Sequence, residues 1–194
     1  MKKLVILFIV SLQLTVLFAN QYTLISDEDF FTLPEVNQVI HPDYVDASII
    51  EAGVFHNTNQ YRASKGLNPL TYNYNLQLSA TIHSTQMYQH DFFNHTNKYN
   101  SNYKDLDDRA DAASYTDYSE LAENIYYGYI DLNDAMTYAE IIEIVTQDFM
   151  ASKGHNETLL TPSLEEFGCG VVFENKIKDG YWQFYLTESF GTQF

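Results

Sequence analysis

Three short polar segments carry side chains that could do chemistry, one each around His95, Glu123 and His155. Imidazole and carboxylate groups are zinc ligands, and zinc sites often leave one position open for water. A bound divalent ion would activate that water, with Glu123 as the candidate general base. The chain has no HExxH or CxxC motif, so these ligands would have to meet from distant segments. Spacing alone therefore leaves both a metal site and purely structural roles open.

The segments that must position these residues change from helical to strand periodicity along the chain. Apolar residues at helical spacing predict helices from 47 to about 65, from 75 to about 89 and over 132–152. A polar region over 91–119, rich in Asn, Asp and Tyr, is expected to be a loop, with Glu123 at its end. Alternating patterns over 168–173 and 181–186 predict a hairpin around a turn at 178–180. The fold class is therefore α+β, with helices packed on an antiparallel hairpin.

The N-terminus has the pattern of a secretory signal over residues 1–19. Two lysines precede an apolar run over 4–18, which is too short for a comfortable membrane span, and Ala19 precedes polar residues. We expect a secreted, extracellular or periplasmic protein, with an uncleaved N-terminal anchor as the alternative. Residues 20–45 are acidic and interrupted by Pro34 and Pro42, which indicates a spacer. The remaining 46–194 are expected to form one domain.

Composition excludes several classes of partner. The chain has 26 acidic and 10 basic residues, a net charge of −16, which argues against binding to nucleic acid or to an anionic membrane surface. Its single cysteine, Cys169, cannot form an internal disulfide and is expected to be a small buried strand residue. The 16 tyrosines crowd the region of the long loop. They could stack on sugar rings or peptides, or reflect a compositional bias.

Several collinear motifs resemble one family. In chain order they are His56-Asn57 with Arg62 and Pro69-Leu70, Leu78-Ser79-Ala80 with His83-Ser84, Phe93-Asn94-His95, Ala122-Glu123-Asn124-Ile125, Phe149-Met150-Ala151-Ser152-Lys153-Gly154-His155, Leu159-Leu160-Thr161-Pro162, Phe167-Gly168-Cys169-Gly170-Val171 and Phe190-Gly191. From about residue 49 to 194, the chain resembles the CAP superfamily of cysteine-rich secretory proteins, antigen 5 and pathogenesis-related class 1 proteins. It is most similar to the disulfide-free bacterial branch.

This resemblance implies a three-layer α-β-α sandwich with a large cleft. In many members of the family, two histidines and two glutamates face that cleft. Position by position, His95 matches the first histidine, Glu123 the first glutamate and His155 the second histidine. The second glutamate falls on Ser152, whose hydroxyl lacks the charge and basicity of a carboxylate. The two imidazoles, with Glu123 or water, are still expected to hold zinc or another divalent cation. Asn124 and Ser152 are further candidate binding residues.

The other histidines have structural interpretations. His56 lies within the first predicted helix and is expected to be a hydrogen-bonded packing residue, and His83 a scaffold residue of the second helix. His90 is expected to interact with carbonyls at the end of that helix. Asn124 is more readily explained as a side chain that fixes its loop than as a reactive group.

Two functions compete. The first is an extracellular binding module for a lipid-like, peptide or glycan partner, with the histidine pair as a metal-assisted or vestigial feature. The alternative is a metal-dependent hydrolase, peptidase or esterase-like, that uses water held at His95 and His155 and Glu123 as general base. Ser152 in place of the second glutamate, and the lack of a nucleophile–base pair, favour binding. The family itself does not decide, because fold does not fix function.

Overall fold

The computed structural model describes residues 21–194, and the predicted signal segment lies outside the described residues. In chain order the elements are η1 (Gln21–Leu24), α2 (Asp27–Phe30), α3 (Ala47–Ser64), β1 (Thr71–Tyr72), α4 (Tyr74–His90), η2 (Ser101–Tyr103), α5 (Leu106–Ala112), β2 (Tyr118–Asp131), α6 (Tyr138–Ala151), α7 (Lys153–Leu159), β3 (Glu166–Lys178) and β4 (Tyr181–Gln193). None of these helices is long and apolar enough to span a membrane.

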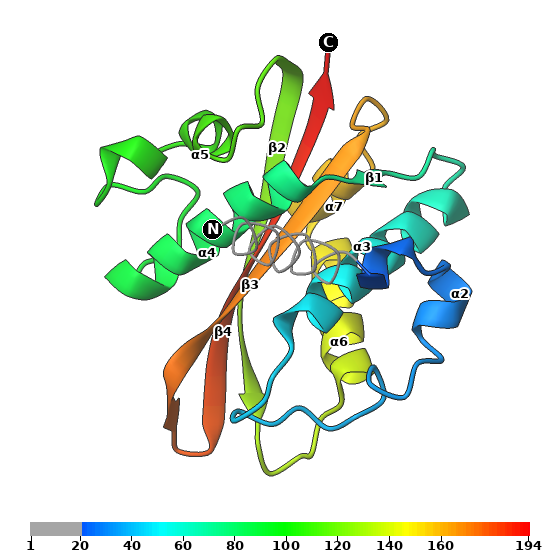
Figure 1. The fold of residues 1–194 in the computed structure, drawn as a ribbon, viewed down its shortest axis with the longest axis vertical. Coiled ribbons are helices and arrows are strands. Elements are labelled where there is room, and N and C mark those ends of the chain that lie inside the picture. Colours follow the sequence, from blue (N-terminus) through cyan, green and yellow to red (C-terminus); the bar gives the residue numbers. More distant parts are fainter. Residues whose placement is uncertain (1–20) are drawn as a thin grey trace, which may run out of the picture.

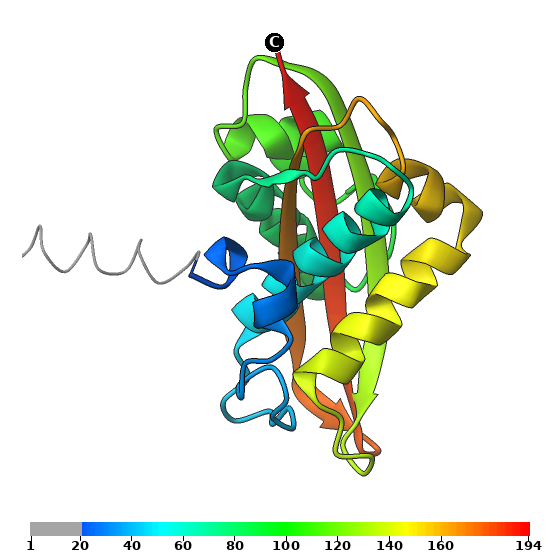
Figure 2. The same ribbon diagram turned by 90° about the vertical axis from the view of Figure 1, so that its right-hand side faces the viewer.

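Four strands form one sheet in the order β1-β3-β4-β2 (Figure 1). Strand β4 pairs antiparallel with both β3 and β2, and only the two-residue β1 adds a parallel pair. The sheet lies between α4 with α5 on one side and α6 with α7 on the other (Figure 2). Helix α3 packs on the same side as α6. The expected α-β-α sandwich is confirmed, and the predicted hairpin forms its centre.

The largest departure from the sequence prediction is β2. Its 14 residues occupy the end of the region expected to be a loop and the gap before the third predicted helix. Helix α6 begins only at Tyr138, not at residue 132, because Thr137 caps it. The Thr137 hydroxyl accepts from the Glu140 amide, and the Glu140 carboxylate accepts from the Thr137 amide. The expected loop also contains η2 and the short helix α5.

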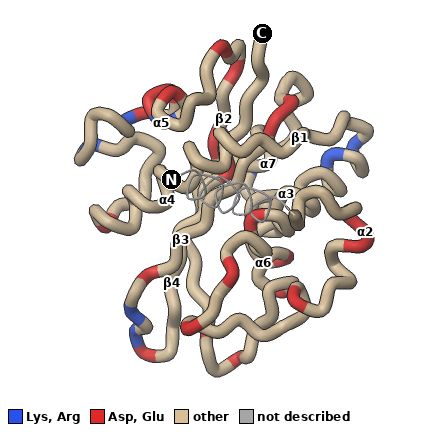
Figure 3. The backbone as a smooth tube through the Cα atoms, in the orientation of Figure 1, with Lys and Arg blue, Asp and Glu red and all other residues tan. Residues whose placement is uncertain are grey.

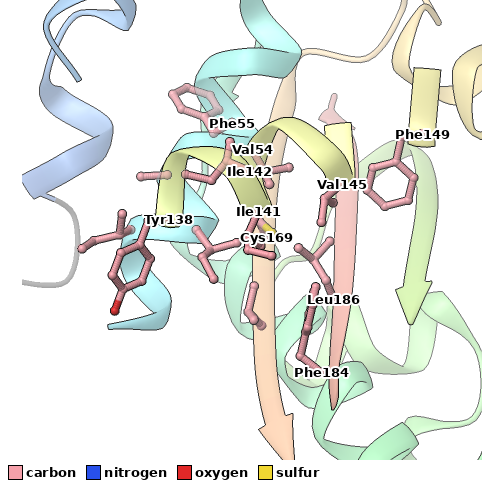
Figure 4. Close-up of a cluster of buried hydrophobic side chains, with 14 of the residues drawn as sticks. Val54, Phe55, Tyr138, Ile141, Ile142, Val145, Phe149, Cys169, Phe184 and Leu186 are labelled. Atoms are coloured by element: carbon pink, nitrogen blue, oxygen red, sulfur yellow. The ribbon is translucent and has the colours of Figure 1, made fainter. Parts of the chain in front are cut away.

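The main hydrophobic core lies between α3, α6 and the sheet (Figure 4). Ile142 of α6 is fully buried against Gly53 of α3, where an added Cβ would meet the isoleucine side chain. Cys169 is free and fully buried in this core, as expected. Part of the segment expected to be a spacer also enters it, because Phe30 and Val36 are fully buried there.

On the opposite face, α4 packs unusually close to β3. A Cβ added at Gly168 would overlap the backbone of Gln77, and one added at Gly170 would overlap that of Thr81. Two glycines on the same face of β3 therefore let α4 lie directly on the sheet. This close approach brings the buried His83 of α4 toward β2.

Candidate functional site

Glu123 lies in the middle of β2, at the edge of the sheet, with its side chain on the α4 face. The segment after α4 brings His95 to it, and α5 brings Arg109. Helix α5 forms because Asp105 and Asp108 make a capping box that satisfies the first amides of the helix. Three segments that are distant in sequence thus meet at one carboxylate.

Both oxygens of Glu123 are engaged, and its side chain is only 4% exposed. Oε1 lies 2.9 Å from Nδ1 of His95, and Oε2 accepts from Nη2 of Arg109 at 2.6 Å. Burial by itself would raise the pKa of the Glu123 carboxyl. The hydrogen bond from His95 and the positive charge of Arg109 outweigh burial and hold the pKa below its ordinary value. Glu123 is therefore ionised at neutral pH, with its charge compensated.

Arg109 is the residue of this site that the sequence analysis missed. Its side chain is fully buried, and Nη1 donates to the carbonyls of His95, Tyr103 and Lys104 at 3.2–3.3 Å. It therefore fixes the loop that carries His95 as well as neutralising Glu123. A single arginine within the acidic segment 105–111 has the pattern of an exposed ion pair, so no spacing rule indicated its burial.

The two histidines beside Glu123 differ in what they can offer. An ionised carboxylate only accepts, so Nδ1 of His95 donates to it and Nε2 stays available as a ligand atom. The His95 side chain is 56% exposed. His83 instead donates from Nε2 to the Asn94 carbonyl at 3.1 Å. Burial lowers the pKa of His83 to about 4, so it is neutral and serves as scaffold, as expected.

His155 approaches the same stretch of β2 from the other side of the sheet. It lies in α7, half-buried, with its ring edge-to-face against Phe149 at 5.1 Å. Burial, and then the nearby His95, lower the pKa of His155, which favours the neutral imidazole that binds metals. Asn124, the residue after Glu123, donates to the His155 carbonyl at 3.3 Å and to the Glu188 carboxyl group at 2.9 Å.

These contacts give Asn124 a positioning role, and none of them involves Ser152. Asn124 is buried, and its amide attaches α7 to β2. Ser152 is half-buried at the junction where α6 ends and α7 begins, and its hydroxyl makes no capping hydrogen bond. The structure therefore brings His95 to Glu123 and His155 to Asn124, two adjacent residues of β2 whose side chains point to opposite faces, whereas Ser152 lies at the junction of α6 and α7.

The ligand atoms of His95, Glu123 and His155 are not gathered as tightly as in a closed metal site. Within residues 21–194, only Asp105, Asp107 and Asp108 form a group of three His, Cys, Asp or Glu side chains whose ligand atoms all lie within 4.8 Å of one another. Capping of α5 accounts for two of these aspartates. Of these side chains, the imidazoles of His95 and His155 are of the type that zinc prefers, and the contact with Glu123 orients the His95 ring.

The remaining histidines lie outside this site. His56 bonds Asp27 at 2.7 Å and the Tyr22 carbonyl at 2.9 Å, which confirms its packing role. His90 ends α4, as predicted, but its ring stacks on Tyr99 with centroids 5.1 Å apart.

Residues 55–188 match the model of the Cysteine-rich secretory protein family, CAP. The chain belongs to this family. An extracellular protein with an SCP domain from Bacillus anthracis has a TM-score of 0.58 at 20% identity, over 79% of this chain and 44% of that one. An outer surface protein from Borrelia burgdorferi has a TM-score of 0.59 at 16% identity, over 77% of this chain and 97% of that one. At these identities the likeness shows the CAP fold alone.

This CAP chain thus spans less than half of the Bacillus protein. The comparison with curated proteins found no match. The single cysteine, free and buried, agrees with the disulfide-free type expected from the sequence.

Proposed function

We propose that this CAP chain is an extracellular binding module that captures a partner at the β2 edge beside His95 and His155, and that it is not a hydrolase. The observation that carries the proposal is the Glu123–Arg109 pair. A general base that works at neutral pH needs a pKa near that pH, whereas the pKa of Glu123 is lowered and both its oxygens are engaged. Ser152 supplies no second carboxylate. The Bacillus and Borrelia proteins, described as extracellular and outer-surface, support the location.

The proposal includes a divalent cation, zinc in the first place, held by His95 and His155. Support comes from the free Nε2 of His95 and from the lowered pKa of His155, which keeps its ring neutral. A zinc ion bound there would act as a Lewis acid toward a partner's oxygen or nitrogen atom. Glu123 would hold the His95 ring in place, as outer carboxylates do for metal-bound histidines. The partner in this proposal is a lipid-like molecule, a peptide or a glycan.

Zinc titration tests the metal. Binding to the native state alone should raise the melting temperature of the protein, because a ligand at 100 times its Kd adds about 2.7 kcal/mol. His95→Ala with His155→Ala should abolish the rise. The matched control is His41→Ala with His90→Ala, which also removes two histidines but should leave the rise intact. An unchanged rise in the first double variant would move the metal elsewhere.

A substrate screen tests the choice between binding and hydrolysis. Wild-type protein and Glu123→Gln, each with zinc, are assayed on broad panels of peptides and esters. We expect the wild-type protein to show no more turnover than the Glu123→Gln variant. Turnover that the wild type shows and Glu123→Gln lacks would establish the hydrolase instead.

A further inference from the structure

The second half of β2, residues 126–131, presents an unprotected strand edge. Within residues 21–194, β2 ends the sheet and pairs only with β4, so its other edge has no strand partner. Natural edge strands are usually protected by lysine, proline or a bulge. Residues 126–131 contain neither lysine nor proline, and the only irregularity in the pairing lies at the other end, between Tyr118 and Glu120.

A hollow of about 470 Å³ follows this edge. Side chains alternate between the two faces of a strand, and Tyr126 packs against Phe149 of α6 whereas Tyr127 packs against Tyr185 on the other face. Both tyrosines nevertheless line the hollow, so the hollow wraps the edge of the strand rather than lying on one face. Across from β2 it is lined by Ile144 and Asp148 of α6, and by Asp134 and Met136 of the preceding loop.

The chemistry of this hollow is anionic and aromatic. Asp131, Asp134 and Asp148 line it, and no Lys, Arg or His nitrogen within residues 21–194 lies within 4 Å of their oxygens. Two further lining residues, Tyr129 and Tyr181, meet edge-to-face with ring centroids 5.0 Å apart. Aromatic faces attract cations as carboxylates do.

The charge of the whole chain acts in the same direction. Figure 3 shows acidic residues spread over most of the fold and basic residues confined to a few segments. The net charge of −16 repels acidic partners and attracts basic ones. A partner for this edge therefore needs both unpaired main-chain groups and positive charge.

We propose that residues 126–131 of β2 bind an extended segment of another protein that carries lysine or arginine side chains. Main-chain hydrogen bonds add the segment to the sheet as a fifth strand, and its basic side chains meet the three aspartates and Tyr129. This inference rests on the proposed binding function, since it names a partner class for the module. The peptide would bind to residues 126–131, the half of β2 that follows the stretch beside His95 and His155. Its binding needs no metal.

The test uses fluorescein-labelled ten-residue peptides and fluorescence polarisation with the whole secreted chain, in EDTA. The first peptide alternates lysine and threonine, and the second has glutamate in place of lysine. A third keeps the lysines but is N-methylated at two adjacent central residues, which blocks both of its edges. A salt concentration of about 0.15 M screens attraction between charges more than about 8 Å apart. We expect the first peptide to bind, and the second and third to bind at least about tenfold more weakly.

Variants locate the binding. Asp134→Asn with Asp148→Asn should weaken binding of the lysine peptide about 2- to 10-fold, the range expected for two exposed ion pairs. Tyr129→Ala should weaken binding of the lysine peptide about 2- to 5-fold, because the residue is 61% exposed and a cation–π contact is lost. The control is Asp111→Asn with Asp117→Asn, which changes the net charge equally at the other end of β2 and should have little effect.

Three results would overturn the inference: equal binding of the N-methylated peptide, equal weakening by the control pair, or equal binding of the glutamate peptide. Equal binding of the N-methylated peptide would show that main-chain pairing is not used. Equal weakening by the control pair would show that the peptide is attracted by the net charge of the chain and not by these aspartates. Peptide binding is measured in EDTA, and zinc binding is measured separately by the melting temperature, so the two results are independent. A chain that binds zinc but no peptide would therefore disprove this inference alone, and one that binds peptide but no zinc would disprove only the metal part of the proposed function.

Discussion

The Glu123 carboxylate and the Arg109 guanidinium are both removed from water, and each compensates the charge of the other. Their contact, 2.6 Å between Oε2 and Nη2, comes with further hydrogen bonds from Arg109 to three backbone carbonyls. Breaking such a pair from one side leaves a buried charge without a partner, which is worse than removing both charges. At the residue scale the site therefore has the electrostatics of a fixed scaffold, with His95 as its exposed member.

Arg109→Met should destabilise the protein by about 3–5 kcal/mol at pH 7, because the buried Glu123 charge loses its partner. Adding Glu123→Gln should restore part of that loss, since the uncompensated charge disappears. Urea denaturation of both single variants and of the double variant measures the coupling. The control, Lys104→Met, removes an exposed contact to Asp105 and should change stability little. Additive losses in the double variant would contradict the pairing.

At the scale of elements, the position of α4 on the sheet decides where the segment that carries His95 begins. Helix α4 lies against β3 at Gly168 and Gly170, with no space for a Cβ at either position. His83 projects from the middle of α4 to within 3.7 Å of Glu123. The glycines of β3 thus act on the site indirectly, by setting the distance between a helix and an edge strand.

Gly168→Ala should displace α4 from the sheet and destabilise the protein by about 1–3 kcal/mol or more, the range for overpacked cores. Gly154→Ala is the matched control, because nothing lies within 4 Å of a Cβ at that helical position. The control should be neutral or slightly stabilising, since alanine is the better helix former. Thermal unfolding of both variants measures the difference, and equal melting temperatures would contradict the close packing.

The sequence predicted α3, α4 and the β3–β4 hairpin because each shows its own periodicity or turn. It did not predict β2, because Glu123 and Asn124 are polar residues whose partners come from distant elements. The partner of Glu123, Arg109, lies in α5, and one partner of Asn124, Glu188, lies in β4. Local patterns cannot show such pairings. Only the family resemblance singled out His95, Glu123 and His155 as site residues, and Arg109 carried no signal of its own.

For the molecule as a whole, buried carboxyls set the response to pH. Burial raises the pKa of Glu51 to about 7 and that of Glu188 to about 8. Hydrogen bonds from Gln77 to Glu51 and from Asn124 to Glu188 offset this only in part. Between their ordinary pKa and these values, the native state holds protons that the unfolded state has released. Stability from these groups is therefore greatest at mildly acidic pH and falls as the pH rises.

The melting temperature should accordingly fall between about pH 5 and pH 8, with a shallower fall in Glu188→Gln. The variant removes one of the two titrating carboxyls, and that carboxyl contributes on the order of a few kcal/mol to the change in the free energy of unfolding across this pH range. Glutamine keeps an oxygen that can accept from Asn124. Asp43→Asn, at an exposed position, is the control and should keep the wild-type slope. A slope unchanged in Glu188→Gln would show that Glu188 is not protonated in the native state.

Anomalous diffraction at the zinc edge, from crystals soaked with zinc, would locate the ion that we propose for His95 and His155. We expect one strong peak at the edge of β2, about 2.0–2.1 Å from Nε2 of His95 and from a ring nitrogen of His155. Glu123 should still contact Arg109 in that structure. A peak bound by Glu123 with the Arg109 contact broken would disprove the proposed site, as would zinc found only at Asp105, Asp107 and Asp108.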